Sequence, residues 1–229
     1  MTYQIFNVDN MKVSLDRSYD VIFADFVYEN SDFLWIDKFW PMLRYSGVLI
    51  CMTDFHTIFD LGRKLMSMQQ SCFVNHLVWK NEWGNHPKDR FHQCFDDIVI
   101  VSKGYGHVFN PTCIQVPKAT AKTSMNPSGR QTKTATAFID DICLTTTSSE
   151  RVKQSDGHLV KWQKPLKLMQ RIIEPFTSSG DSVLDLFMGS GTLGEWCIRN
   201  DREYTGIEID PEVFTLARTR LESAHKEIS

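Results

Sequence analysis

A glycine-rich segment near the C-terminal end of the chain is the strongest candidate for a binding site. An apolar run at residues 183–187 leads into Gly189, Gly191 and Gly194, which have the spacing Gly-x-Gly-x-x-Gly. Glycines at such a turn let the backbone approach a ligand closely. Glu208 follows at the end of the next predicted strand, where a carboxylate can accept hydrogen bonds from ribose hydroxyls. This order predicts a site for a nucleoside-type cofactor, with a tight turn and a helix-capping acid as the alternative.

A carboxylate near the N-terminal end is the second candidate. The largely apolar segment at residues 19–24 is typical of a buried strand and is followed by Asp25, and the aromatic Tyr28 comes three positions later. A carboxylate at the end of a strand can face a ligand at the edge of the sheet, or it can cap the following helix. From these residues alone, both interpretations stay open.

The elements that must position these residues alternate along the chain. Short β-branched runs and segments of helical period predict an α/β fold with a mostly parallel sheet and helices on both faces. Predicted strands cover residues 19–24, 47–52, 73–79, 98–101, 182–187 and 204–209, and predicted helices cover residues 32–43, 54–68, 165–176, 192–199 and 211–225. Only 21 residues follow Glu208, so the other strands must come from earlier in the chain. The fold is therefore permuted, which disfavours an ordinary nicotinamide dehydrogenase, whose domain begins with this fingerprint.

With these elements in place, the chain resembles the β-class DNA amino-methyltransferases, a permuted group whose catalytic tetrapeptide precedes its S-adenosylmethionine (SAM) loop. The matching residues are 7–9, 25–28, 47–54, 161–166 and 185–192, so the resemblance covers most of the length. Its most specific part is the Phe-x-Gly-x-Gly-Thr string from Phe187 to Thr192, with Lys164 and Pro165 about 20 residues upstream. The resemblance implies a single domain over residues 1–229 with a permuted, Rossmann-like SAM-dependent methyltransferase fold.

The resemblance also implies roles for individual residues. An exocyclic amino nitrogen of a base is a poor nucleophile, because its lone pair is delocalised into the ring. In this family, Asp25 would accept one N–H of that amine, the carbonyl of Phe26 would accept the other, and Tyr28 would stack on the flipped base. The implied cofactor contacts are Asp9 for the adenine amino group, Lys164 for the methionine carboxylate, Asp185, Phe187, Gly189, Gly191 and Thr192 for the methionine part, and Glu208 for the ribose.

One departure from the family concerns the catalytic tetrapeptide, which usually has the form Asp-Pro-Pro-Tyr or Ser-Pro-Pro-Tyr. This chain has Phe26 and Val27 where the prolines belong. Two prolines hold the loop rigid, whereas Val27 adds a β-branched side chain and an N–H to a crowded turn. Asp25 and Tyr28 supply the side chains that the mechanism uses, so we expect an active enzyme, with a catalytically silent SAM- or DNA-binding module as the alternative.

A basic segment supplies the candidate DNA contacts. No acidic residue occurs from residue 98 to residue 139, and the composition is that of a long exposed loop. Residues 104–160 correspond to the inserted segment where the family places its target-reading element. The candidate phosphate contacts there are Lys118, Lys122, Arg130 and Lys133, and a second candidate segment, residues 81–93, contains Lys88 and Arg90. The short insertion suggests relaxed specificity, a very short site, or recognition shared across a homodimer.

Composition and charge exclude several classes of protein. Hydrophobic residues make up 42% and charged residues 23%, which is typical of a globular protein. The net charge of −3 argues against a wholly basic nucleic-acid-binding surface. We see no membrane-length apolar run and no secretory signal, and six widely spaced cysteines suit a reducing cytoplasm, bacterial or phage-infected. No metal site is expected, because no spacing of histidines and cysteines matches one.

The sequence thus predicts an enzyme that methylates the N6 amino group of adenine in double-stranded DNA with SAM as cofactor. Methylation of cytosine N4 is the nearest variant, and methylation of RNA or protein on the same scaffold is a more distant one.

Overall fold

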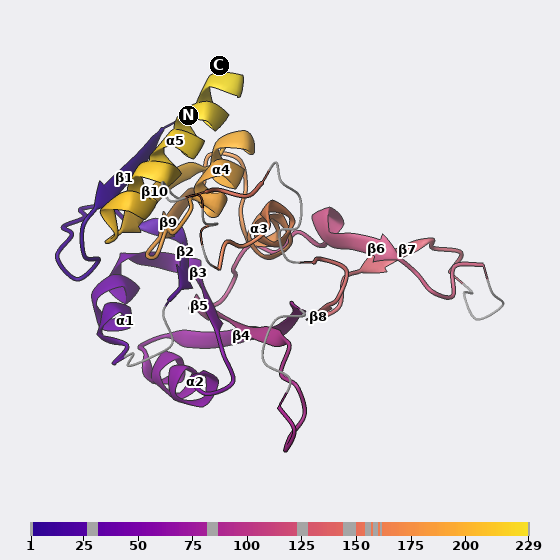
Figure 1. Cartoon of the computed structure of the whole chain (residues 1–229). Helices are drawn as coiled ribbons and strands as arrows, with labels where there is room; N and C mark the ends of the chain where they lie inside the picture. Colours follow the sequence, from indigo (N-terminus) through magenta and orange to yellow (C-terminus); the bar gives the residue numbers. More distant parts are fainter. Residues whose placement is uncertain are drawn as a thin grey trace.

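The computed structural model describes residues 2–26, 32–81, 87–122, 128–143, 150–153, 157, 160 and 162–228. Its centre is an eight-stranded sheet with the strand order β1-β10-β9-β2-β3-β5-β4-β8 (Figure 1). The strands of this sheet are β1 (Tyr3–Asn7), β2 (Tyr19–Asp25), β3 (Leu43–Thr53), β4 (Ser71–Lys80), β5 (Phe95–Lys103), β8 (Phe138–Ile139), β9 (Ser182–Asp185) and β10 (Glu203–Glu208). A separate two-stranded ribbon consists of β6 (Gln115–Pro117) and β7 (Thr132–Thr134).

The strand pairing confirms the predicted permutation. β9 pairs in parallel with β2, and β10 pairs in parallel with β1, so the C-terminal glycine-rich unit lies among the N-terminal strands. Five of the seven pairings described in the large sheet are parallel, and β5 pairs antiparallel with both β3 and β4. The mostly parallel sheet predicted from the sequence is therefore confirmed.

Helices cover both faces of the sheet, as predicted (Figure 1). The helices are α1 (Leu34–Phe39), α2 (Ile58–Ser67), α3 (Leu166–Ile173), α4 (Thr192–Arg199) and α5 (Pro211–Ile228), with short 3-10 turns at Trp40–Met42, Pro111–Ile114 and Glu174–Phe176. Successive side chains of a strand point to opposite faces. Val21 and Phe23 of β2 accordingly pack in one apolar cluster with α3, α4 and α5, whereas Ile22 and Ala24 pack in a second cluster with α1 and α2. Among the described helices, none combines the length and the apolarity needed to cross a bilayer.

Several element boundaries differ from the sequence prediction. The predicted helix over residues 32–43 is interrupted, and α1 ends at Phe39. A 3-10 turn containing Pro41 follows, since proline cannot donate the backbone hydrogen bond that would continue the helix. β5 begins at Phe95 rather than at residue 98. The sequence prediction left out Asp96 and Asp97, because aspartate is rare in strands. β1, β6, β7 and β8 were not predicted.

The described part of residues 104–160 is more structured than the exposed loop expected from its composition. It contributes β8 to the edge of the large sheet, and Ile139 and Ile142 are buried in the core. The indole Nε1 of Trp79 donates a hydrogen bond of 2.8 Å to the Ile142 carbonyl, which fixes this segment to β4. The apolar residues that make these contacts stand in short, isolated groups in the sequence, so no periodic pattern predicts their burial.

Candidate active site

Three predicted acidic residues meet at one edge of the sheet. Asp25 ends β2, Asp185 ends β9 and Glu208 ends β10, and these three strands run parallel. Because parallel strands end at the same edge, their terminal carboxylates lie close enough for the charges of Asp25 and Glu208 to raise the pKa of Asp185. Asp9 follows β1, whose last residue Asn7 pairs with Glu208, and so belongs to the same edge. The structure thus brings together Asp9, Asp25, Asp185 and Glu208.

The glycine-rich turn has the backbone geometry that its sequence predicts. Gly189 and Gly191 adopt positive φ angles of 52° and 76°, a conformation that other residues rarely adopt. A Cβ atom at Gly191 would also lie only 3.2 Å from Cβ of Ala217 in α5. Glu208 accepts a hydrogen bond of 2.8 Å from the backbone N–H of Gly189. The turn and the predicted ribose-binding carboxylate are therefore directly connected.

Arg220, which the sequence did not single out, supports this turn from α5. Its guanidinium donates a hydrogen bond of 2.9 Å to the hydroxyl of Thr192 and pairs with Glu195. Thr192 is buried, and this contact anchors the first residue of α4. The observed role of Thr192 is thus to hold the turn, and the predicted cofactor contact stays a prediction.

Asp185 is the most deeply buried carboxylate of the site. It is 1% exposed and accepts a hydrogen bond of 3.0 Å from the hydroxyl of Tyr204. Burial is the main cause that raises its pKa to about 7, against the lowering effect of the hydrogen bonds from Tyr204 and the Phe187 N–H. Asp185 can therefore take up or release a proton near neutral pH.

Lys164 forms an ion pair that its predicted role does not include. Its Nζ lies 2.8 Å from Oδ2 of Asp25, and the contact with the methionine carboxylate that the resemblance implies stays a prediction. Both side chains are largely buried, with 10% of Lys164 and 19% of Asp25 exposed. Lys164 precedes α3 by two residues, and α3 packs on the face of the sheet to which Val21 and Phe23 point. By strand alternation Asp25 points to that face too, which explains the pair.

Phe26 fills an aromatic cluster on the opposite face. It is 4% exposed, and its ring lies 5.9 Å from Phe33, 5.6 Å from Trp35 and 6.2 Å from Phe187, measured between ring centroids. A proline could not fill this space. The departure from the family tetrapeptide thus provides packing, and it ties the catalytic strand to the glycine-rich segment through Phe187. Val27 and Tyr28, the remaining residues of the tetrapeptide, lie outside the described residues.

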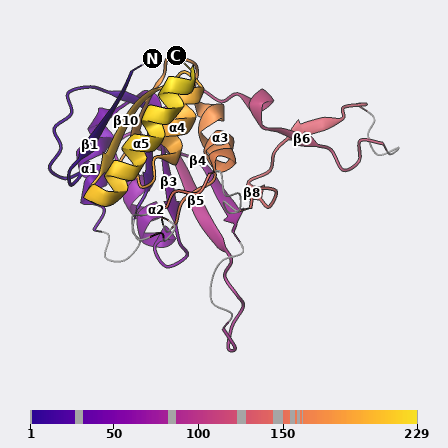
Figure 2. The same ribbon diagram turned by 45° about the horizontal axis from the view of Figure 1, so that its top comes forward.

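The predicted DNA contacts fall into two separate groups. Lys118, Lys122, Arg130 and Lys133 belong to the β6–β7 ribbon and its connecting segment, where Val116 pairs with Lys133. This ribbon extends far from the sheet in both views of the molecule (Figures 1 and 2). Lys88 and Arg90 are exposed on the connection between β4 and β5, and Arg90 lies 3.7 Å from Asp89. The β4–β5 connection projects in a different direction from the ribbon (Figure 2).

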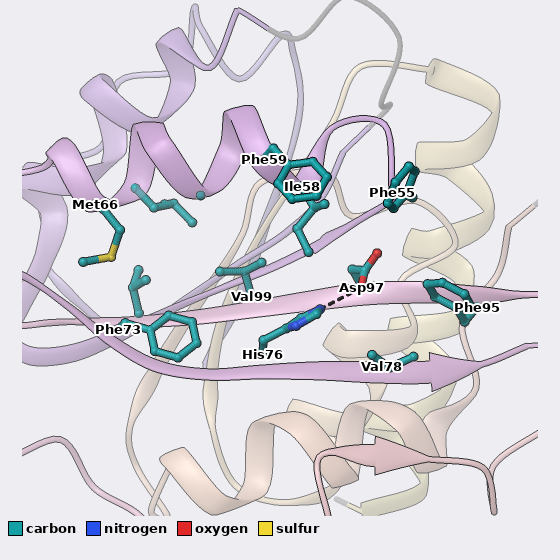
Figure 3. Close-up of a pocket in the computed structure, with 13 residues that line it drawn as sticks. Phe55, Ile58, Phe59, Met66, Phe73, His76, Val78, Phe95, Asp97 and Val99 are labelled. Carbon is teal, nitrogen blue, oxygen red and sulfur yellow. Dashed lines mark hydrogen bonds and ion pairs between the residues drawn. The ribbon is translucent and has the colours of Figure 1, made fainter. Parts of the chain in front are cut away.

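A pocket of about 530 Å³ lies on the opposite face of the sheet from Lys164. Side chains of α2, β4 and β5 line it, including Phe59, Phe73 and Val99, and His76 contacts Asp97 within it at 2.7 Å (Figure 3). Asp97 and Val99 point to this face because they alternate with Asp96 and Ile98. The pocket is therefore separate from the edge that carries Asp25 and Glu208.

The acidic edge suits SAM, whose sulfonium and ammonium groups are positively charged. Three carboxylates, those of Asp25, Asp185 and Glu208, face one ammonium group, that of Lys164, and Gly189 of the turn is partly exposed at this edge. Glu208 would hold the ribose, the turn around Gly189 would hold the methionine part, and Asp9 would meet the adenine. The strand order, with the C-terminal glycine-rich unit placed among the N-terminal strands, defines a permuted Rossmann-like α/β fold with a nucleoside-type binding edge.

Comparison with known proteins identifies the family. The family model described as DNA methylase, for the N6 and N4 enzymes, matches residues 23–219, so this chain belongs to that family of SAM-dependent DNA amino-methyltransferases. The family predicted from the sequence is thus confirmed.

Curated relatives include the type II methyltransferase M2.DpnII of Streptococcus pneumoniae. The two sequences are 27% identical over 199 residues, which cover 84% of this chain and 66% of that protein. M.XycI of Xanthomonas campestris pv. cyanopsidis is 44% identical over 64 residues, 28% of this chain and 21% of that protein. The chain therefore spans slightly less than two thirds of M2.DpnII and about a fifth of M.XycI.

Solved structures share the fold. The M1.HpyAVI–SAM complex has a TM-score of 0.72 with 24% identity, over 96% of this chain and 99% of that one. The cytosine-N4-specific PvuII DNA methyltransferase has a TM-score of 0.70 with 13% identity, over 100% of this chain and 93% of that one. The predicted methyltransferase fold is confirmed by both.

Proposed function

We propose that this protein transfers a methyl group from SAM to the N6 amino group of adenine in double-stranded DNA. The observation that carries the proposal is the position of Asp25, beside the glycine-rich turn and coupled electrostatically to Asp185. A carboxylate at this place can bind an amine next to the methyl donor. Cytosine N4 is the second candidate, because the PvuII enzyme of the same fold is specific for it.

The proposed chemistry needs acceptors for both hydrogens of the target amine. Asp25 accepts one N–H, and the backbone carbonyl of Phe26 accepts the other, which directs the nitrogen lone pair out of the plane of the base. When bound, SAM supplies a methyl group on a positively charged sulfur. Methylation leaves a positive charge on the amino nitrogen. The negative charge of Asp25 stabilises this positive charge until the nitrogen loses one of its protons. Tyr28 stays the predicted stacking partner of the flipped base.

The β6–β7 ribbon is the proposed DNA-contacting arm. A two-stranded ribbon fits into the major groove of DNA, and basic side chains beside it can contact phosphates. Lys122, Arg130 and Lys133 are exposed, and Lys118 is half-buried. No acidic residue from 98 to 139 opposes their charge. Lys88 and Arg90, on their separate connection, are proposed as secondary contacts.

The test of the proposed function is transfer of a labelled methyl group from SAM to unmethylated DNA, followed by digestion to nucleosides. We expect the label in N6-methyl-2′-deoxyadenosine. Label in N4-methyl-2′-deoxycytidine would replace the adenine assignment by the cytosine one. A protein that binds SAM and labels neither nucleoside would instead be the silent binding module. RNA and a protein mixture serve as alternative substrates in the same assay and should remain unlabelled.

Neutralising the ribbon should weaken DNA binding and its salt dependence. The test variant has alanine in place of Lys118, Lys122, Arg130 and Lys133. The slope of the logarithm of its DNA-binding constant against the logarithm of the salt concentration should become shallower by about 0.9 for each phosphate contact removed. Binding titrations at several salt concentrations measure this slope. Replacing Arg63, Arg218 and Lys226, exposed residues of α2 and α5, is the control and should change it little. An equal slope in the ribbon variant and the wild type would refute the assigned contacts.

Two further expectations accompany the proposal. The enzyme would act in the cytoplasm of a bacterial cell or of a phage-infected host, where its DNA substrate is. A homodimer, through which two copies would share recognition of the site, stays a prediction.

A further inference from the structure

Asp96, a residue without an assigned role, lies at the same edge of the sheet as Asp25. β3 separates the two strands, and Met52 of β3 pairs with Asp25 on one side and with Ile98 on the other. Asp96 precedes Ile98 by two residues in the antiparallel β5, so it lies toward the edge where β2 ends. Ile98 packs in the same cluster as Phe23. By alternation, Asp25 and Asp96 therefore point to the same face, which α3 covers.

Lys164 reaches this face beside Asp25 and lies close enough to Asp96 for its charge to act on that carboxyl. It forms the 2.8 Å ion pair with Asp25, and its charge is the strongest influence that lowers the pKa of Asp96. The other groups that act on Asp96 are Asn81, which forms a side-chain hydrogen bond with it, and the charges of Asp25 and Asp97, which raise its pKa. Burial dominates these effects and raises the pKa of Asp96 to about 6. Lys164 therefore acts on both carboxylates, through a direct ion pair with Asp25 and through its charge on Asp96.

The ion pair conflicts with the chemistry assigned to Asp25. A target amine must reach the Asp25 carboxylate, but the ammonium group of Lys164 already contacts Oδ2. Removing a largely buried ammonium from its partner is costly unless another carboxylate receives it. Asp96 is a carboxylate on the same face that interacts with the same lysine.

We propose that Asp96 is a positioning residue that takes over the ammonium group of Lys164 when the target amine binds Asp25. The inference rests on the proposed function, since it requires Asp25 to bind the amine. In this exchange no covalent bond changes, and the total charge of the site stays constant. Below about pH 6, Asp96 is protonated and neutral, so Lys164 stays on Asp25 and blocks it. Transfer should therefore rise with pH as Asp96 ionises.

A double-mutant cycle in the full-length enzyme tests the exchange. We expect Asp96→Asn to lower kcat by about tenfold or more, the effect of losing a hydrogen-bond partner of a charged group. The KM for SAM should change by less than about twofold, and the rise of the rate near pH 6 should disappear. Asp96→Glu, which keeps the carboxylate, should restore most of the rate and the pH dependence. In the Lys164→Met background, Asp96→Asn should have almost no further effect. If the losses of kcat in Asp96→Asn and Lys164→Met simply add in the double variant, the proposal is overturned. It is also overturned if Asp96→Asn keeps the pH profile of the wild type.

A titration of the isolated protein separates this proposal from the proposed function. Carboxyl carbon NMR of Asp96 should give a higher pKa in Lys164→Met than in the wild type, because the lysine charge lowers it. An unchanged titration would overturn the pairing of Asp96 with Lys164, whether or not the protein transfers methyl groups. A wild type that transfers nothing but shows the shifted titration would refute the proposed function and leave the pairing in place.

Discussion

Replacing Asp25 with asparagine should lower methyl transfer to DNA by a factor of about 10² to 10⁴, the range for loss of a group that acts directly on the proton of the reacting amine. The asparagine has nearly the same shape but no charge, and its amide NH₂ would face the N–H groups of the target amine. It would also leave Lys164 without its observed partner. SAM affinity should stay within about twofold, since the glycine-rich turn, Asp185 and Glu208 are unchanged.

Single-turnover transfer assays and calorimetric SAM titrations measure these two quantities separately. Asp60→Asn, which removes an exposed carboxylate of α2, is the matched control and should behave as the wild type in both. Equal transfer rates in Asp25→Asn and the wild type would refute the role of Asp25. A parallel loss of SAM affinity would instead assign Asp25 to cofactor binding.

The second large effect concerns the pH dependence of stability and the residue Asp185. Its pKa is raised to about 7 in the folded protein, against about 3.9 in an unfolded chain. The folded state therefore binds the proton more tightly than the unfolded state. This contribution to stability is fully present below about pH 4 and is lost as the pH rises through about 7. The difference of about three pKa units corresponds to ~4 kcal/mol.

Asp185→Asn cannot ionise, so it should not undergo this loss. We expect the free energy of unfolding of Asp185→Asn, relative to the wild type, to increase by ~4 kcal/mol between pH 4 and pH 8. Urea unfolding at four pH values across this range measures the difference. Glu222→Gln, which removes an exposed carboxylate of α5, is the control. If the difference in the free energy of unfolding between Asp185→Asn and the wild type stays constant from pH 4 to pH 8, Asp185 is ionised over this whole range.

The same substitution should weaken SAM binding, although it removes the loss of stability that the wild type undergoes as the pH rises. A cationic cofactor favours the ionised carboxylate, so the SAM affinity of the wild type should rise as the pH passes through about 7. In Asp185→Asn the affinity should be at least about tenfold lower and independent of this ionisation. Calorimetric titrations at pH 6 and pH 8 distinguish the two proteins.

The glycine-rich turn, Glu208 and Asp25 could be predicted from the sequence for a common physical reason. Each lies where an apolar strand ends, and strand ends are encoded by short, local patterns. The left-handed conformations of Gly189 and Gly191 are likewise local, because they follow from the missing side chain. These features together determined the fold class and the likeness to the DNA methylases.

The contacts between elements distant in the sequence were decided only by the tertiary structure. Lys164 pairs with Asp25 because α3 packs on the face to which Asp25 points, a contact that the resemblance does not imply. Asp96 reaches the same face only through the register of β3 and β5. Phe26, a departure in the tetrapeptide, becomes a packing residue once Trp35 and Phe187 surround it. Local patterns specify the backbone of each strand, but the charges and rings that meet across the sheet depend on its strand order and register.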